Sequence, residues 1–142
     1  NLPVIQPYRK ASSHIVRTLS QSITLVDDSE KLPVSTLTQK TAFPPNFIHS
    51  LDSTHMLLTA IEMDKRGLTF AAVHDSYWTH ANDVPIMNTT LRSCFFDLYS
   101  KPILEDLRDS FQLRFQDIDF PRIPDRGSLD ISRVMQAPYF FS

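Results

Sequence analysis

A histidine and a carboxylate stand together at the end of a short apolar run in the middle of the chain. Residues 68–73 read LTFAAV, carry no charge, and lead directly into His74 and Asp75. A strand that is apolar on both faces is usually buried on both faces, so we expect this run to be a buried strand. An ionised carboxylate at its end is costly to bury without a partner, and a hard divalent cation such as Mg²⁺ binds carboxylate oxygens. The position therefore favours a metal site at Asp75, with a buried structural His-Asp pair as the simpler alternative.

A second polar group recurs at helical spacing. Asn46, His49, Asp52 and His55 follow one another at three-residue steps, so we expect them to share a broad face of a helix. Such a face could bind a metal ion, contact a nucleic-acid groove or form an internal ladder of hydrogen bonds. The residue types alone favour the ladder.

Two further features are better explained by packing than by chemistry. Cys94 lies within an expected helix and has no basic neighbour in the sequence to activate its thiol. The chain ends in Tyr139, Phe140, Phe141 and Ser142. Chain ends are usually polar and frayed, so we expect this aromatic end to pack into a groove.

An α+β arrangement must position these groups. Residues 13–26 and 32–38 are rich in strand formers and flank an acidic turn at residues 27–30, which predicts a β-hairpin. Pro44 and Pro45 predict the start of a helix of about twenty residues that ends near Gly67. The strand at residues 68–73 then follows directly.

Two more helices are expected towards the end of the chain. One begins at Asn82 or Asp83, either of which is a suitable N-cap, and runs to about Ser100. The other restarts at Pro102. A short amphipathic segment is expected around residues 129–135.

The composition limits the classes of protein that remain. The chain has 142 residues, a net charge of −2, a single cysteine and two glycines. The length is that of one domain with a core, and the charge does not suit a basic nucleic-acid module acting alone. Glycine-rich phosphate loops and an internal disulfide are excluded, and no run approaches the roughly 18 apolar residues of a membrane span. Because the chain begins at Asn1 without a signal-peptide layout, we expect it to be part of a longer polypeptide.

Several stretches together resemble one known family. Residues 39–55 read QKTAFPPNFIHSLDSTH and resemble the signature of the single-subunit, bacteriophage-type RNA polymerases. Residues 73–81, VHDSYWTHA, resemble the palm motif of the same family, and the segments QPYRK at 6–10 and YFFS at 139–142 also fit. The resemblance therefore covers essentially the whole chain. The form FPPNFIHSLD resembles mitochondrial members more than phage members, and it suggests a fungal source.

The resemblance implies the C-terminal portion of a right-hand polymerase. Residues 1–40 would form an extended segment and a peripheral hairpin like the specificity loop. Residues 41–81 would form a helix and the palm hairpin with the catalytic strand and turn. Residues 82–142 would form the C-terminal helices, packed against that hairpin, and the terminal foot.

Roles at the reaction centre follow from the same resemblance. Asp75 corresponds to the palm aspartate that coordinates two catalytic magnesium ions, and His74 would orient that carboxylate. His49 would approach the nucleic acid near the nascent base pair. Asn46 and Asp52 would support His49.

The resemblance also implies partners and a location. Phe141 and Ser142 would form the terminal foot, which folds back towards the active site. The partners would be a DNA template and promoter, the RNA transcript, ribonucleoside triphosphates and a mitochondrial transcription factor, in the mitochondrial matrix. The factor is expected because the hairpin lacks the close-set Arg, Asn and Gln side chains with which phage enzymes read promoters.

One departure from the family pattern limits what this chain can do alone. A two-metal site needs a second aspartate, which the family places upstream of these residues together with the nucleotide-binding helix. We therefore expect the isolated chain to be inactive. Two alternatives stay open: a His-Asp metal phosphohydrolase, which would place its His-Asp pair on helices, and a non-enzymatic module that binds protein or nucleic acid.

Overall fold

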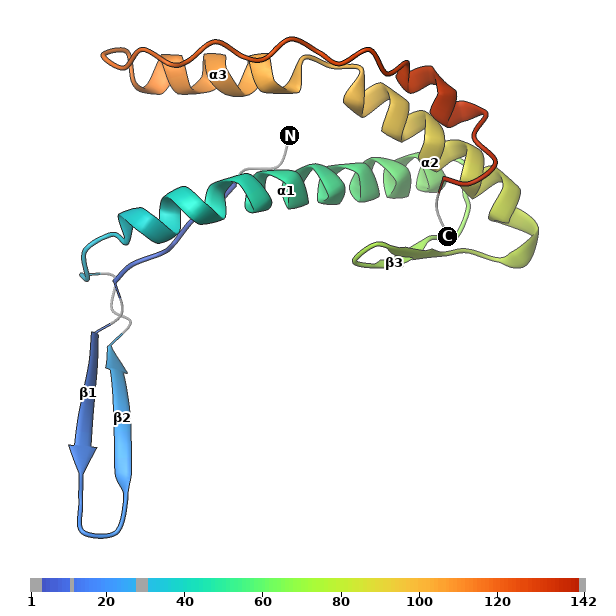
Figure 1. The fold of residues 1–142 in the computed structure, drawn as a ribbon. Helices are drawn as coiled ribbons and strands as arrows, with labels where there is room; N and C mark the ends of the chain where they lie inside the picture. The colour runs from blue at the N-terminus through green and yellow to red at the C-terminus, as the bar shows by residue number, and fades with distance from the viewer. Residues whose placement is uncertain (1–3, 11, 28–30, 141–142) are drawn as a thin grey trace. The chain divides into compact units, whose positions relative to one another are not determined.

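The computed structural model describes residues 4–10, 12–27 and 31–140 of the chain. They fall into two compact units, Asn1–Ser53 and Thr54–Ser142. The described residues form three α-helices and two antiparallel two-stranded sheets (Figure 1). The α+β class expected from the sequence is therefore confirmed. None of the helices in the described residues has the length and hydropathy needed to cross a bilayer.

The first unit contains a hairpin whose turn lies earlier than predicted. Strand β1 (Ser12–Arg17) pairs antiparallel with β2 (Ser22–Asp27). In the loop between them, the Thr18 backbone N–H donates to the Gln21 carbonyl over 2.8 Å, and the Thr18 hydroxyl donates to it over 3.0 Å. The hairpin therefore turns at residues 18–21 and not at the predicted residues 27–30, because Thr18 closes the loop without any of the usual acidic or glycine signals. Residues 28–30 lie outside the described residues.

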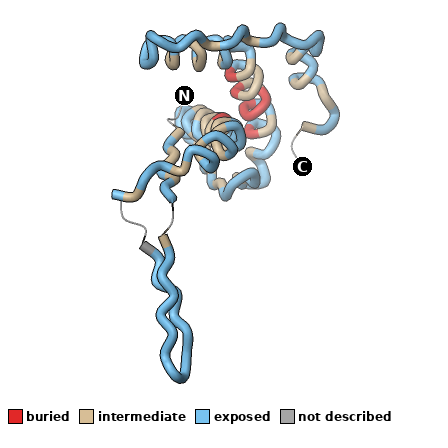
Figure 2. The backbone as a smooth tube through the Cα atoms, turned by 60° about the vertical axis from the view of Figure 1, so that its left-hand side comes forward, coloured by how far each residue is buried: buried red, intermediate tan, exposed pale blue. Residues whose placement is uncertain are grey.

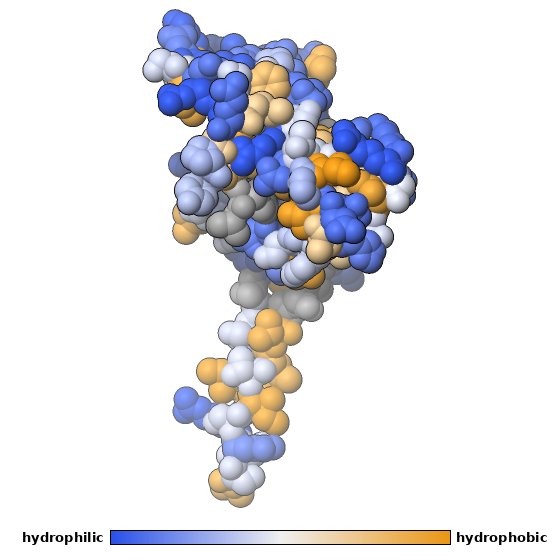
Figure 3. Space-filling view, turned by 90° about the vertical axis from the view of Figure 1, so that its right-hand side faces the viewer, coloured by the Kyte–Doolittle hydropathy of each residue, from blue (hydrophilic) through white to orange (hydrophobic). Residues whose placement is uncertain are grey.

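Both faces of the β1–β2 hairpin carry exposed aliphatic side chains. In the observed register Val16 lies opposite Ile23, and His14 lies opposite Leu25, on one face. All three aliphatic side chains of that face are exposed, and apolar side chains are visible along the hairpin in Figure 3. The opposite face carries the exposed aliphatic side chains of Ile15 and Val26 beside serine, threonine and Arg17. The hairpin therefore presents aliphatic side chains on both faces, and these suit protein contact better than phosphate contact.

Helix α1 (Thr36–Lys65) begins eight residues before the predicted start and contains Pro44 and Pro45 in its interior. It has 30 residues rather than the expected twenty. The predicted strand at residues 32–38 is confirmed only at Val34, which forms an antiparallel bridge with Arg9, whereas residues 36–38 belong to the helix. The early start is held by Gln39, whose side-chain N–H groups donate to the carbonyls of Gln6 (2.6 Å) and Tyr8 (3.3 Å). These contacts join residues more than thirty positions apart, so a local proline signal could not reveal them. The predicted stop is confirmed, since Gly67 has φ +68°, a conformation that glycine adopts at little cost.

The second unit is built around helix α2. Strands β3 (Ala71–Val73) and β4 (Ser76–Trp78) form a hairpin, followed by α2 (Val84–Tyr99) and α3 (Ile103–Arg114). Short 3₁₀ turns occupy Ala81–Asp83 and Ile131–Met135. The two predicted C-terminal helices are confirmed, and the predicted segment around residues 129–135 is a 3₁₀ turn.

The core of the second unit joins α1, α2 and the β3–β4 hairpin. Met63, Met87 and Leu91 form a buried cluster, and most of the buried residues of this unit lie on α2 (Figure 2). Partly buried apolar side chains pack against the cluster from the hairpin and from the end of the chain: Leu68, Phe70, Tyr77 and Phe140. The hairpin is therefore held from one side by this core.

The expectation of a strand buried on both faces was wrong. Strand β3 has three residues, of which Ala71 and Val73 are exposed and Ala72 is half-buried. Ala72 pairs with Tyr77, whose ring packs on the core cluster, whereas the exposed face carries Val73 and Trp78. A two-stranded hairpin covered on one side alternates between buried and exposed positions, so its apolar composition does not imply two buried faces.

His74 occupies a backbone conformation that most side chains avoid. It is the first residue of the two-residue turn between β3 and β4 and has φ 55°. Histidine and asparagine visit this region several times more often than other non-glycine residues, and β-branched residues are true outliers there. We expect His74→Asn to leave the melting temperature nearly unchanged, and His74→Val to destabilise the chain by about 1–2 kcal/mol. Thermal unfolding checks this, and equal melting temperatures for the two variants would contradict it.

Candidate functional site

Asp75 lies at the tip of the β3–β4 hairpin. The register pairs Val73 with Ser76, so His74 and Asp75 are the two turn residues, and both are exposed. An exposed carboxylate keeps its hydration, so it does not require a cation to compensate for burial. The desolvation argument for a metal at Asp75 was therefore wrong. The structure shows instead that Asp75 lies in a two-residue hairpin turn.

A cavity of about 240 Å³ opens beside this turn. Its lining residues come from the turn, from β4 and from the first half of α2: Asp75, Ser76, Tyr77, Val84, Met87, Asn88 and Leu91. The polar groups of the wall belong to Asp75, Ser76, Tyr77 and Asn88, and the other lining residues are apolar. The cavity thus places one anionic group and a few hydrogen-bonding groups around a space lined with aliphatic side chains.

Asn88 is a site residue that the sequence reasoning missed. Its side-chain oxygen accepts a hydrogen bond of 2.8 Å from Nε of Arg92, one helical turn further along α2. The available signal was the Asn-Arg pair at i,i+4 on a helix that was correctly predicted. That spacing is common, and only the cavity distinguishes this pair from an ordinary surface pair.

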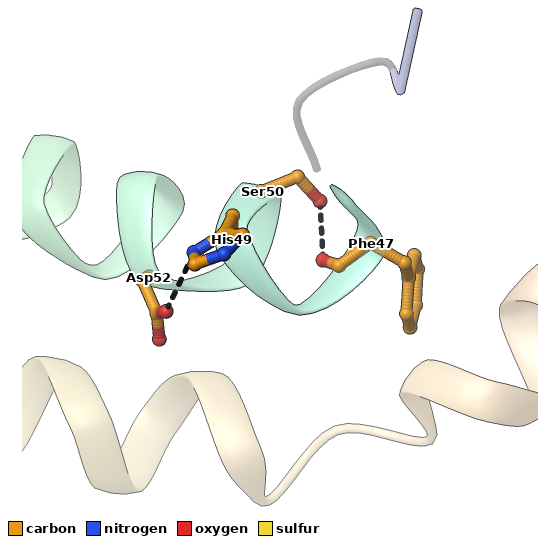
Figure 4. A network of polar contacts seen from close by, with 4 residues as sticks. All are labelled: Phe47, His49, Ser50 and Asp52. Carbon is orange, nitrogen blue, oxygen red and sulfur yellow. Dashed lines mark hydrogen bonds and ion pairs between the residues drawn. The ribbon is translucent and has the colours of Figure 1, made fainter. Parts of the chain in front are cut away.

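The other predicted group, on α1, is divided by the structure. His49 and Asp52 are exposed, and His49 Nδ1 lies 3.9 Å from Asp52 Oδ2 (Figure 4). Their side chains are 78% and 64% exposed, so this contact contributes little to stability. His55, in contrast, is buried, and its Nε2 lies 2.8 Å from the Leu91 carbonyl oxygen. The expectation of one shared face was wrong, since each three-residue step on an α-helix shifts the side chain by about 60° around the axis.

Asn46 and His49 border an open pocket within the first unit. The pocket measures about 360 Å³ and is lined by Val4, Ile5, Tyr8, Asn46, His49, Ser50 and Ser53. Asn46 Nδ2 donates to the Tyr8 hydroxyl over 2.9 Å, which ties the helix to the N-terminal segment. The Ser50 hydroxyl turns back to the Phe47 carbonyl over 2.7 Å (Figure 4). His49 is therefore an exposed polar side chain at the border of this pocket.

The donor set for a metal ion is incomplete in this chain. Across the part of the chain that the structure describes, no three His, Cys, Asp or Glu side chains gather closely enough to hold a metal. Asp75 alone supplies a hard anionic oxygen at the cavity, of the kind that Mg²⁺ prefers. It fits one position in a magnesium coordination sphere, and the remaining ligands would have to come from other residues.

The remaining predictions concern Cys94 and the end of the chain. Cys94 is buried on α2, and burial raises the pKa of its thiol, against a smaller lowering by a hydrogen bond with Thr59. The prediction that it packs rather than reacts is supported, because a raised pKa keeps the thiol protonated.

At the end of the chain, Phe140 packs against the core cluster. Phe141 and Ser142 lie outside the described residues, so their predicted role as a terminal foot stays a prediction.

Comparison with known proteins identifies similar chains along the whole length. Residues 1–118 match the family described as DNA-dependent RNA polymerase. The chain is 54% identical over 141 residues to DNA-directed RNA polymerase 1, mitochondrial, of Arabidopsis thaliana, covering 99% of this chain and 14% of that protein. It is 53% identical to DNA-directed RNA polymerase 1A of Nicotiana tabacum, covering 99% of this chain and 90% of that protein. A third relative, 52% identical, is DNA-directed RNA polymerase 2B, chloroplastic/mitochondrial, of Nicotiana tabacum, of which the chain spans 14%.

Proposed function

The chain belongs to the DNA-dependent RNA polymerase family, and from this membership we propose that Asp75 is a catalytic residue of template-dependent RNA synthesis. The family resemblance seen in the sequence is thereby confirmed. These relatives come from plants, so the suggested fungal source stays a prediction. The observation that carries the proposal is the carboxylate at a two-residue hairpin turn, beside a cavity, in a chain with this membership.

The reaction joins the RNA 3′-hydroxyl to the α-phosphate of a ribonucleoside triphosphate and releases pyrophosphate, which makes the protein a nucleotidyltransferase. Two magnesium ions, when bound, would neutralise the charge that develops on the phosphoryl oxygens. Asp75 would hold them together with a second aspartate from outside this chain. The palm of a right-hand polymerase is the expected location of the β3–β4 hairpin.

His74 would act by setting the direction of Asp75. Its positive φ fixes the turn, and the core cluster holds the hairpin from one side through Tyr77. Such a supported turn would limit the directions that the Asp75 carboxylate can take before a ligand binds, and preorganisation of this kind favours electrostatic catalysis.

The first unit would contribute contacts to nucleic acid. His49 is exposed at an open pocket, with Asn46 anchored by Tyr8 and Asp52 near the imidazole. We assign His49 to the nucleic acid near the nascent base pair, with Asn46 and Asp52 as its support. This arrangement leaves the imidazole free to approach a base or sugar edge.

The β1–β2 hairpin would occupy the place of the specificity loop. Both of its faces carry exposed aliphatic side chains, such as Val16 on one and Ile15 on the other, and these offer few groups for reading base edges. Promoter DNA would therefore be recognised with the help of a mitochondrial transcription factor.

DNA template, RNA transcript and ribonucleoside triphosphates are the other proposed partners. The names of several relatives support a mitochondrial location, and we place the protein in the matrix, with Phe141 and Ser142 as the terminal foot.

Both alternative functions lose support. A His-Asp metal phosphohydrolase places its His-Asp pair on helices, whereas residues 71–78 form a hairpin. A binding module without catalytic function would not account for family membership over residues 1–118.

Localised cleavage by iron tests the metal assignment independently of RNA synthesis. Fe²⁺ would replace Mg²⁺ in a full-length polymerase that carries this segment, and ascorbate with peroxide would generate hydroxyl radicals at the metal. We expect the chain to be cut within a few residues of Asp75, and excess Mg²⁺ to suppress the cut. Mass spectrometry of the fragments locates the cleavage. Cleavage confined to other segments would overturn the assignment of Asp75 as a ligand.

A further inference from the structure

Arg92 is a buried charge that the proposed mechanism does not use. It lies on α2 and is 8% exposed. A buried guanidinium is costly unless its N–H groups are paired, so its partners show what it holds in place. Each of its hydrogen bonds leads either to the cavity beside Asp75 or to the end of the chain.

Towards the cavity, Arg92 holds Asn88. Nε donates to Asn88 Oδ1 over 2.8 Å, so the carboxamide oxygen is occupied and its orientation is set. The amide nitrogen of Asn88 then has two N–H groups for other acceptors. Asn88 shares the cavity wall with Asp75 and Tyr77.

Towards the end of the chain, Arg92 holds the segment after the last 3₁₀ turn. Nη1 donates to the carbonyl of Val134 over 2.5 Å and to that of Ala137 over 2.8 Å. The guanidinium carbon also lies 5.2 Å from the centre of the Phe140 ring, within the range of a cation–π contact. These partners are more than forty residues away in sequence.

From this geometry we infer that Asn88 is a further residue of the catalytic cavity and that Arg92 is its positioning residue. Asn88 presents amide N–H groups to anionic oxygen atoms that enter the cavity, such as those of the nucleotide phosphates. Arg92 fixes the orientation of that amide, and its other hydrogen bonds hold the segment that contains Val134 and Ala137. The inference rests on the proposed function, since it takes the cavity beside Asp75 to be the reaction site.

A double-mutant cycle in a full-length polymerase carrying this segment tests the inference. Asn88→Ala removes the amide, and Arg92→Met keeps the stem of the side chain but removes its donors. We expect each change to lower the maximal rate of single-nucleotide addition by about 10- to 100-fold. Because the two residues act through one amide, the double variant should be no slower than the slower single variant.

Control variants separate positioning from folding. Arg108 is half-buried on α3 and donates to the Phe120 carbonyl over 3.4 Å, so Arg108→Met makes the same substitution and removes a single, longer hydrogen bond away from the cavity. It should leave the rate within about twofold. Arg92→Lys should recover little, because one ammonium cannot reproduce the directions of a guanidinium. Iron-directed cleavage near Asp75 should persist in every variant.

The outcomes are distinguishable. A normal rate for Asn88→Ala, or losses that multiply in the double variant, would overturn the inference while leaving Asp75 as a ligand. Equal losses for Arg92→Met and Arg108→Met, with matching falls in melting temperature, would show that Arg92 only stabilises the fold. Absence of cleavage near Asp75 in the wild-type enzyme would instead refute the proposed function.

Discussion

Replacing Asp75 with asparagine in a full-length polymerase that carries this segment should lower nucleotide addition by at least about a thousandfold. Asparagine keeps the size of the side chain but loses the negative charge, and Mg²⁺ binds a neutral amide oxygen far more weakly than a carboxylate. Several kcal/mol of charge stabilisation disappear from the transition state, and each 1.4 kcal/mol or so is worth a factor of ten. Binding of template DNA should change little, because Asp75 is a single exposed turn residue.

Rapid-quench extension of an RNA primer on a DNA template measures the rate, and fluorescence anisotropy of the same scaffold measures binding. Asp97→Asn is the matched control, because Asp97 is an exposed carboxylate on α2 that does not line the cavity. It should elongate at close to the wild-type rate. Near-normal elongation by the Asp75 variant would remove this residue from the mechanism.

Truncating Met63 to alanine should destabilise the chain by about 2–5 kcal/mol. Met63 is 0% exposed and packs with Met87 and Leu91 at the centre of the second unit. The change removes buried apolar area and leaves a cavity among side chains that can only partly collapse. Because Phe70 and Tyr77 pack on the same cluster, hydrogen exchange should also become faster across the β3–β4 hairpin.

Urea unfolding of the 142-residue chain measures this effect. Met63→Leu nearly conserves volume and should cost less than about 1.5 kcal/mol. Met135→Ala is the exposed control, since that side chain is 41% exposed. If Met63→Ala unfolds at the same urea concentration as Met135→Ala, the cluster does not hold the hairpin as described.

The elements that sequence reasoning located well are those with strong local signals. Helices α2 and α3 follow an apolar period of three to four residues, and Pro102 separates them. The errors arose where contacts between distant residues override a local signal, or where a local signal is missing. Gln39 extends α1 backwards through bonds to the distant residues Gln6 and Tyr8. Thr18 closes the first hairpin through a local bond to Gln21, at a site without a strong turn signature.

By itself, the sequence determined the family of the chain and identified Asp75 as its candidate catalytic residue. That was possible because the motifs around His49 and Asp75 are contiguous, and chemistry of this kind requires particular residues in a particular order. Only the tertiary structure decided that Asp75 is exposed at a turn, that His55 is buried, and that Asn88 borders the cavity. Burial and hydrogen bonding depend on what packs against a residue, and two of the partners of Arg92, the carbonyls of Val134 and Ala137, lie more than forty positions further along the chain.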